Sequence, residues 1–183
     1  MKRLAIVTII LMVHALWAAS PVGVAVTVVG SVFSLELQDA NRFPVAGEMD
    51  LGRYEPGTSD FPVQGVVVAG CKSNLGTQWS LQIEAPDSLV NQANGQSLAE
   101  GALRVRGLSP TKSPDGKKLP GNLITVEQPV TQKTLTVYTS DNRGDAGFNN
   151  YEGTYVPLGF GVNVPKAQTP GTYTGRILIT MTE

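Results

Sequence analysis

The residues with the clearest potential for chemistry lie in one polar loop. The stretch 141–152 reads DNRGDAGFNNYE and carries carboxylates at Asp141, Asp145 and Glu152. Carboxylate oxygens spaced along a short loop are ligands that Ca²⁺ prefers, so this spacing indicates a weak candidate calcium site. The third and sixth positions are an arginine and an alanine, where an EF-hand has an oxygen ligand and a glycine. We therefore favour an ordinary solvated loop and expect no cofactor.

Aromatic side chains in and beside this loop suggest a second kind of site. Phe148, Tyr151 and Tyr155 follow one another closely in the sequence. If the three rings are exposed, they form a stacking platform on which a sugar binds. If they are buried, they fill one end of a packed domain. We favour the buried arrangement and keep sugar binding as the alternative.

Catalysis that depends on histidine is excluded if the first residues are removed. His14 is the single histidine, and it lies in an apolar stretch near the N-terminus. Without it the chain has no His base for a hydrolase and no His ligand for zinc or copper. No carboxylate lies in an apolar run, where burial would raise its pKa. We therefore expect no enzymatic activity.

The N-terminus has the organisation of a secretory signal peptide. Lys2 and Arg3 precede an apolar run over 4–19, and small residues suited to cleavage occur within 18–25. The run is short for a membrane span, although an uncleaved anchor remains the alternative. We predict a signal peptide over 1–19 and a single domain over 26–183. The protein would be exported to a bacterial cell surface, the periplasm or the medium.

Charge and cysteine content restrict the partners and the means of stabilisation. Loss of Lys2 and Arg3 lowers the formal net charge from -1 to about -3. This mild acidity, without a basic cluster, argues against nucleic acid as a partner. Cys71 is the single cysteine, so no internal disulfide can form. We favour a buried, inert thiol over an intermolecular bridge, because three valines precede it.

The clearest strand pattern is at the C-terminal end. Over 172–182, Tyr173, Ile177 and Ile179 alternate with mostly polar residues, and a Pro-Gly turn precedes them. A period of two in a Thr- and Ile-rich stretch predicts a β-strand with one apolar face. We expect these three side chains to lie in the core.

A second clear alternation occupies 76–85. Trp79, Leu81 and Ile83 share one face of the predicted strand, and polar residues share the other. Trp79 is the expected core anchor, because an indole buries a large area. Further strands are predicted at 24–38, 48–54, 61–69, 98–105, 123–126, 134–138 and 155–164. With Gly and Pro between them and no amphipathic helix, they predict an antiparallel immunoglobulin-like β-sandwich of about nine strands.

The order of these features resembles two groups of bacterial surface domains. Residues 171–173 (GTY) and the strand after them resemble the terminal strand of spore-coat-U and fimbrial-subunit domains, while Trp79-Ser80-Leu81 matches the motif of WxL cell-wall-binding domains. The first group has paired cysteines, where this chain has Cys71 alone. The second has a later Trp-x-Leu, where this chain reads YVPLGF at 155–160. The resemblance implies an immunoglobulin-like surface sandwich and leaves the ligand open.

These observations predict a non-enzymatic surface protein, structural or adhesive, that assembles by sheet-edge pairing. Residues 24–38 or 172–182 would be the participating strand. Its partners would be other envelope proteins or further copies of itself. The alternative is a carbohydrate-binding module of the cell envelope that uses 148–155 to bind a cell-wall or surface glycan.

Overall fold

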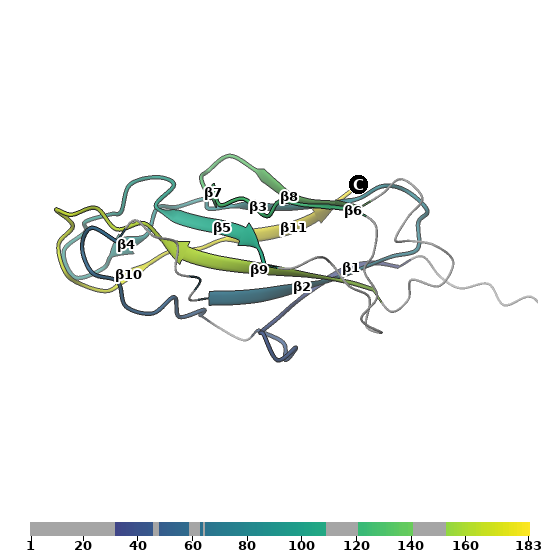
Figure 1. The fold of residues 1–183 in the computed structure, drawn as a ribbon, viewed down its shortest axis with the longest axis horizontal. Coiled ribbons are helices and arrows are strands. Elements are labelled where there is room, and N and C mark those ends of the chain that lie inside the picture. The colour runs from purple at the N-terminus through teal and green to yellow at the C-terminus, as the bar shows by residue number, and fades with distance from the viewer. Residues whose placement is uncertain (1–31, 46–47, 59–62, 64, 109–120, 141–152) are drawn as a thin grey trace, which may run out of the picture. The chain divides into compact units, whose positions relative to one another are not determined.

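The computed structural model describes residues 32–45, 48–58, 63, 65–108, 121–140 and 153–183. Contacts between residues group 31–183 into one compact unit. The described part is all-β and contains no helix, and its strands pair antiparallel in two layers (Figure 1). The predicted antiparallel β-sandwich is therefore confirmed. The predicted signal peptide lies outside the described residues.

Eleven strands occur in the described part of the chain. They are β1 (Phe33–Gln38), β2 (Gly65–Ser73), β3 (Ser80–Glu84), β4 (Val90–Asn91), β5 (Leu103–Gly107), β6 (Gly121–Leu123), β7 (Gln128–Pro129), β8 (Leu135–Ser140), β9 (Thr154–Val162), β10 (Tyr173–Thr174) and β11 (Leu178–Thr182). The number exceeds the expected nine or so because β4, β7 and β10 have two residues each.

Two sheets form the layers of the sandwich. The five-stranded sheet has the order β1-β2-β9-β5-β7, and the four-stranded sheet has the order β11-β3-β8-β6. A small third ladder pairs β10 with β4. The fully buried side chains come from the facing sides of the two large sheets, as the period of two requires. The largest of them are Trp79, Tyr138, Phe160, Leu81, Ile83 and Leu158.

The residues expected in the core fall into two groups. Trp79, Leu81 and Ile83 are at most 1% exposed. Tyr173, Ile177 and Ile179 are partly buried and pack against the core from its margin. The margin position follows from topology, because β11 is an edge strand and β10 belongs to the small third ladder.

The strand predicted at 48–54 is wrong, because those residues form an irregular segment. The Asp50 Oδ1 atom accepts a hydrogen bond of 2.8 Å from the Gly52 amide. Gly52 has a φ of 82°, a left-handed conformation that interrupts regular strand geometry. Met49 and Leu51 still pack against the core, which explains why the segment has apolar residues in strand-like spacing.

The single strand predicted over 172–182 is also wrong in one respect, because it is broken into β10 and β11. Its partner is broken at the same level: β3 ends at Glu84 and β4 begins at Val90. Pro86 lies in the partner's gap and has no amide to donate to a ladder. On the other side, Gly175 lies so close to Leu89 that a Cβ atom would be 2.8 Å from the leucine Cδ2. The pairing between these two segments of the chain is therefore interrupted at the same level on both sides.

Candidate functional site

The candidate calcium ligands and most of the candidate sugar platform lie outside the described residues. This holds for Asp141, Asp145 and Glu152, and for Phe148 and Tyr151. Within the part of the chain that the structure describes, no group of three or more His, Cys, Asp or Glu side chains is placed to hold a metal ion.

Tyr155 is the one platform residue that the structure describes. It lies half-buried in β9, opposite Gly70 of β2 on the outer face of the five-stranded sheet. The Arg42 guanidinium carbon lies 3.9 Å from the centre of the ring. A cation over an aromatic face is attracted by the ring quadrupole. One face of Tyr155 is therefore already occupied by a residue of the same chain.

The turn that carries Arg42 is held by its own hydrogen bonds. Asp39 Oδ1 accepts from the amides of Asn41 and Phe43, at 2.8 and 2.9 Å. Arg42 has a φ of 68°, which is uncommon for a residue with a Cβ atom. This contact could not be predicted from the sequence, because the 39–42 stretch has only the composition of a polar turn.

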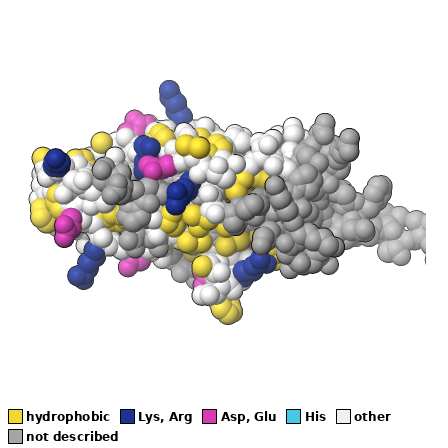
Figure 2. All heavy atoms as spheres, viewed as in Figure 1, with side chains coloured by type: hydrophobic (Ala, Val, Ile, Leu, Met, Phe, Trp, Pro, Cys, Tyr) yellow, Lys and Arg dark blue, Asp and Glu magenta, His cyan; other side chains and the backbone are white. Residues whose placement is uncertain are grey.

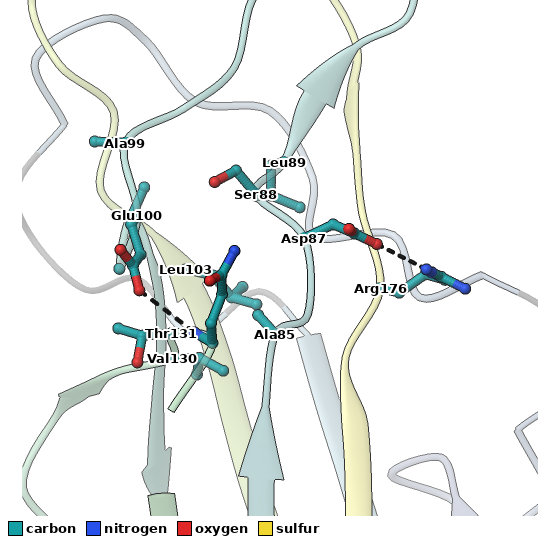
Figure 3. A pocket seen from close by; sticks show the side chains of 13 residues that line it. Ala85, Asp87, Ser88, Leu89, Ala99, Glu100, Leu103, Val130, Thr131 and Arg176 are labelled. Atoms are coloured by element: carbon teal, nitrogen blue, oxygen red, sulfur yellow. Dashed lines mark hydrogen bonds and ion pairs between the residues drawn. The ribbon is translucent and has the colours of Figure 1, made fainter. Parts of the chain in front are cut away.

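A shallow hollow lies where the ends of several strands meet (Figure 3). Its cavity volume is about 20 Å³, which is room for a water molecule and too little for a sugar ring. Asp87 and Arg176 form an exposed ion pair of 2.8 Å at its margin. Glu100 accepts a hydrogen bond of 3.4 Å from the Gln132 amide on the other side. Its charged side chains are thus already engaged by other groups of the chain.

Two residues singled out from the sequence lie deep in the core. Cys71 is 0% exposed, and its thiol donates a hydrogen bond of 3.8 Å to the Ala69 carbonyl. Trp79, from the Trp-Ser-Leu motif, packs its ring against Tyr138 with 5.1 Å between ring centres and a tilt of 50°. Its Nε1 atom is buried without a hydrogen-bond partner. Neither side chain is presented to a ligand at the surface of the domain.

One side of the sandwich is closed by the chain itself. Between β6 and β7 the chain crosses from the four-stranded to the five-stranded sheet. On this crossing, Ile124 accepts a hydrogen bond of 2.7 Å from the Gly107 amide and donates one of 2.9 Å to the Val137 carbonyl. Because Gly107 belongs to β5 and Val137 to β8, this one residue links the two layers.

The opposite side of the sandwich ends in two sheet edges. The edge strand of the five-stranded sheet is β1, and that of the four-stranded sheet is β11. Some Cα atoms of the two strands lie within 8 Å of each other. Among the described residues, β1 pairs along its length with β2, and β11 pairs with β3.

The edge strands differ in how well they are protected against pairing with another chain. Short length, Pro and charged side chains all discourage such pairing. On the closed side, β7 has two residues and contains Pro129, and β6 has three. On the open side, β1 carries Glu36, and the Val45 amide donates a hydrogen bond of 2.9 Å to the Leu37 carbonyl at its end.

The C-terminal edge strand has none of these protections. Its sequence, LITMT, contains neither a charge nor a proline. Leu178 on its outer face is 49% exposed. A five-residue apolar and Thr-rich edge is a ready template for another strand.

Exposed apolar side chains are spread over the domain. The large ones are Phe33, Phe43, Leu75, Leu108, Val126 and Leu178. On the face that Figure 2 shows, groups of apolar side chains alternate with Lys, Arg, Asp and Glu. The edge strands therefore offer a more specific docking feature than any apolar patch on this face.

Comparisons with known proteins returned no relative. No family model, no curated protein and no solved structure matches this chain. The described part of the chain contains no helix that could span a membrane.

Proposed function

We propose that this is an exported, non-enzymatic surface protein, structural or adhesive, that assembles by pairing an open sheet edge with another chain. The observation that supports this proposal is the asymmetry of the sandwich. The chain closes one side by crossing between the sheets at Ile124, whereas the other side ends in β1 and β11.

The physical basis is the backbone of an edge strand. Each edge residue whose amide and carbonyl point away from the sheet leaves both groups to water or to a partner strand. A strand added there gains a row of main-chain hydrogen bonds, and the side chains beside it set the specificity. Natural proteins that remain monomeric usually protect such edges. Among the described residues, no strand pairs with β11 on the side away from β3.

Export is supported by the sequence alone. The basic start, the apolar run over 4–19 and the small residues after it have the order of a signal peptide. With that segment removed, the remaining chain has no histidine, which supports a binding or structural role.

Charged substitutions on the two open edges test the proposal. Thr180→Lys in β11 and Ser34→Glu in β1 each place a charge on an exposed edge position. Ser34 is opposite Lys72, so a glutamate there suits the folded domain. Thr136→Lys is the matched control, because Thr136 is also exposed and lies in the same row of the sheet, but in the central strand β8.

Light scattering after size-exclusion chromatography gives the outcome. The wild-type mature protein and Thr136→Lys should form larger species as concentration rises. At least one edge variant should remain monomeric at the same concentrations. A wild type that is monomeric at every concentration and salt would contradict the proposal, and so would equal assembly by all four proteins.

A further inference from the structure

We propose that the partner at the β11 edge is β11 of a second copy, paired antiparallel about a two-fold axis at Thr180. This inference rests on the proposed function and names its partner. This pairing would join the four-stranded sheet of one copy to the same sheet of the second copy.

The direction of the backbone groups in β11 follows from its neighbour β3. The Trp79 carbonyl accepts from Ser140, and the Ala85 amide donates to Thr131, so the odd-numbered residues of β3 point their backbone groups away from β11. Backbone direction alternates along a strand, so the even-numbered residues of β3 point toward β11.

The register then identifies the free groups of β11. The even residues of β3 are opposite Leu178, Thr180 and Thr182, which therefore use their backbone groups within the sheet. Ile179 and Met181 lie between them and point their amides and carbonyls outward. Each copy thus presents two residues, placed symmetrically about Thr180, whose outward donors and acceptors bond to no other described part of the chain.

This symmetry allows the strand to pair with itself. In antiparallel pairing about Thr180, Ile179 of one copy is opposite Met181 of the other, and each such pair exchanges two hydrogen bonds. The two Thr180 residues face each other as a non-hydrogen-bonded pair, with Cα atoms about 4.5 Å apart. All outward groups of the strand are then satisfied in one register.

The charges around the strand also suit self-pairing. The strand itself is uncharged. Arg176, in an ion pair with Asp87, precedes it and Glu183 follows it, so antiparallel pairing about Thr180 places no like charges opposite each other. Self-pairing of β1 would instead bring two Glu36 carboxylates together, and the turn at Val45 already occupies part of that edge.

A junction of one short strand per copy is small, so trapping by a disulfide is the appropriate test. Thr180→Cys places a thiol on the axis, where the Cβ separation of a non-hydrogen-bonded pair suits a disulfide. Cys71 is buried, which leaves the new thiol as the one at the surface. Under mild oxidation, Thr180→Cys should form covalent dimers about ten times faster than Thr136→Cys, since prior association raises the effective concentration of the thiols.

The register has its own control. Leu178→Cys and Thr182→Cys should each dimerise slowly alone and should crosslink with each other when mixed, because residue 178 is opposite residue 182 in the proposed pairing. Equal rates for Thr180→Cys and Thr136→Cys would overturn the inference. If the wild type still assembles in that case, the sheet-edge proposal stands and a different edge or register is used. If the wild type is also monomeric, both proposals fail.

Discussion

Replacing Trp79 by phenylalanine should change the free energy of unfolding by less than about 1 kcal/mol, whereas alanine should cost about 3–5 kcal/mol. Trp79 is 1% exposed and packs against Tyr138. Its Nε1 atom is buried with no hydrogen-bond partner. The two substitutions therefore separate the apolar contribution of the ring from the cost of its polar atom.

The magnitudes follow from these contacts. Phenylalanine keeps a ring against Tyr138 and loses about three heavy atoms, which costs about 1–3 kcal/mol in burial and residual cavity. It also removes a buried N–H without a partner, whose desolvation costs a similar 1–3 kcal/mol, roughly. The two terms nearly cancel. Alanine removes the ring contact as well, so its cavity term dominates.

Urea unfolding followed by far-ultraviolet circular dichroism measures both variants without depending on the lost indole fluorescence. For a domain of this size, each kcal/mol shifts Tm by about 2–4 °C, so Trp79→Ala should melt about 6–20 °C lower. Trp79→Phe should melt near the wild type. A phenylalanine variant as unstable as the alanine variant would contradict this prediction, since it would show that the buried N–H stabilises the folded state.

Three further substitutions test other parts of the structure. Gly107→Ala should destabilise the domain by about 1–3 kcal/mol in thermal melts, because a Cβ atom there would collide with the Leu123 side chain, and Leu123→Ala should restore part of the loss. Asp39→Ala should cost about 0.5–2 kcal/mol in urea unfolding, since two backbone amides lose their acceptor. Burial raises the pKa of Tyr54 above its ordinary value of 10.0. The contribution of the neutral Tyr54 side chain to the free energy of unfolding is therefore complete below pH 10 and is lost as pH rises through the higher folded-state pKa. The stability of wild type should therefore fall more steeply above pH 10 than that of Tyr54→Phe, and parallel pH curves would contradict this.

The fold class could be predicted from the sequence because alternating apolar and polar residues, and the turn residues between them, determine the local backbone structure. The alternation over 76–85 correctly predicted the burial of Trp79, Leu81 and Ile83, because one face of β3 packs against the core along its whole length. The strand predictions failed where a local turn, or an interruption in the neighbouring strand, determined the backbone structure. Gly52 turns the segment predicted as a strand at 48–54, and the break between β10 and β11 depends on Pro86 and Leu89 far away in the chain.

The candidate edge could be predicted only in part. The sequence indicated that the last strand needs a neighbour, but which strands form sheet edges is a property of the topology. At Ile124 the chain crosses between the sheets and closes one side of the sandwich through hydrogen bonds to both of them. No local sequence pattern predicts that crossing. Pro129 in a short strand is no reliable signal of an edge, because Pro157 lies in β9, an interior strand of the same sheet. The uncharged sequence of β11 indicates a site for strand pairing only when the strand is known to lie at a sheet edge.

The most direct test of the central proposal is the state of the protein recovered from an exporting cell. Intact mass spectrometry would give the mass of the chain, and size-exclusion chromatography with light scattering would give its oligomeric state. We expect a chain cleaved within 18–25 that forms species larger than a monomer, which Thr180→Lys reduces. A cleaved protein that remains a monomer at every concentration would contradict assembly through a sheet edge, and an uncleaved chain would contradict the predicted signal peptide.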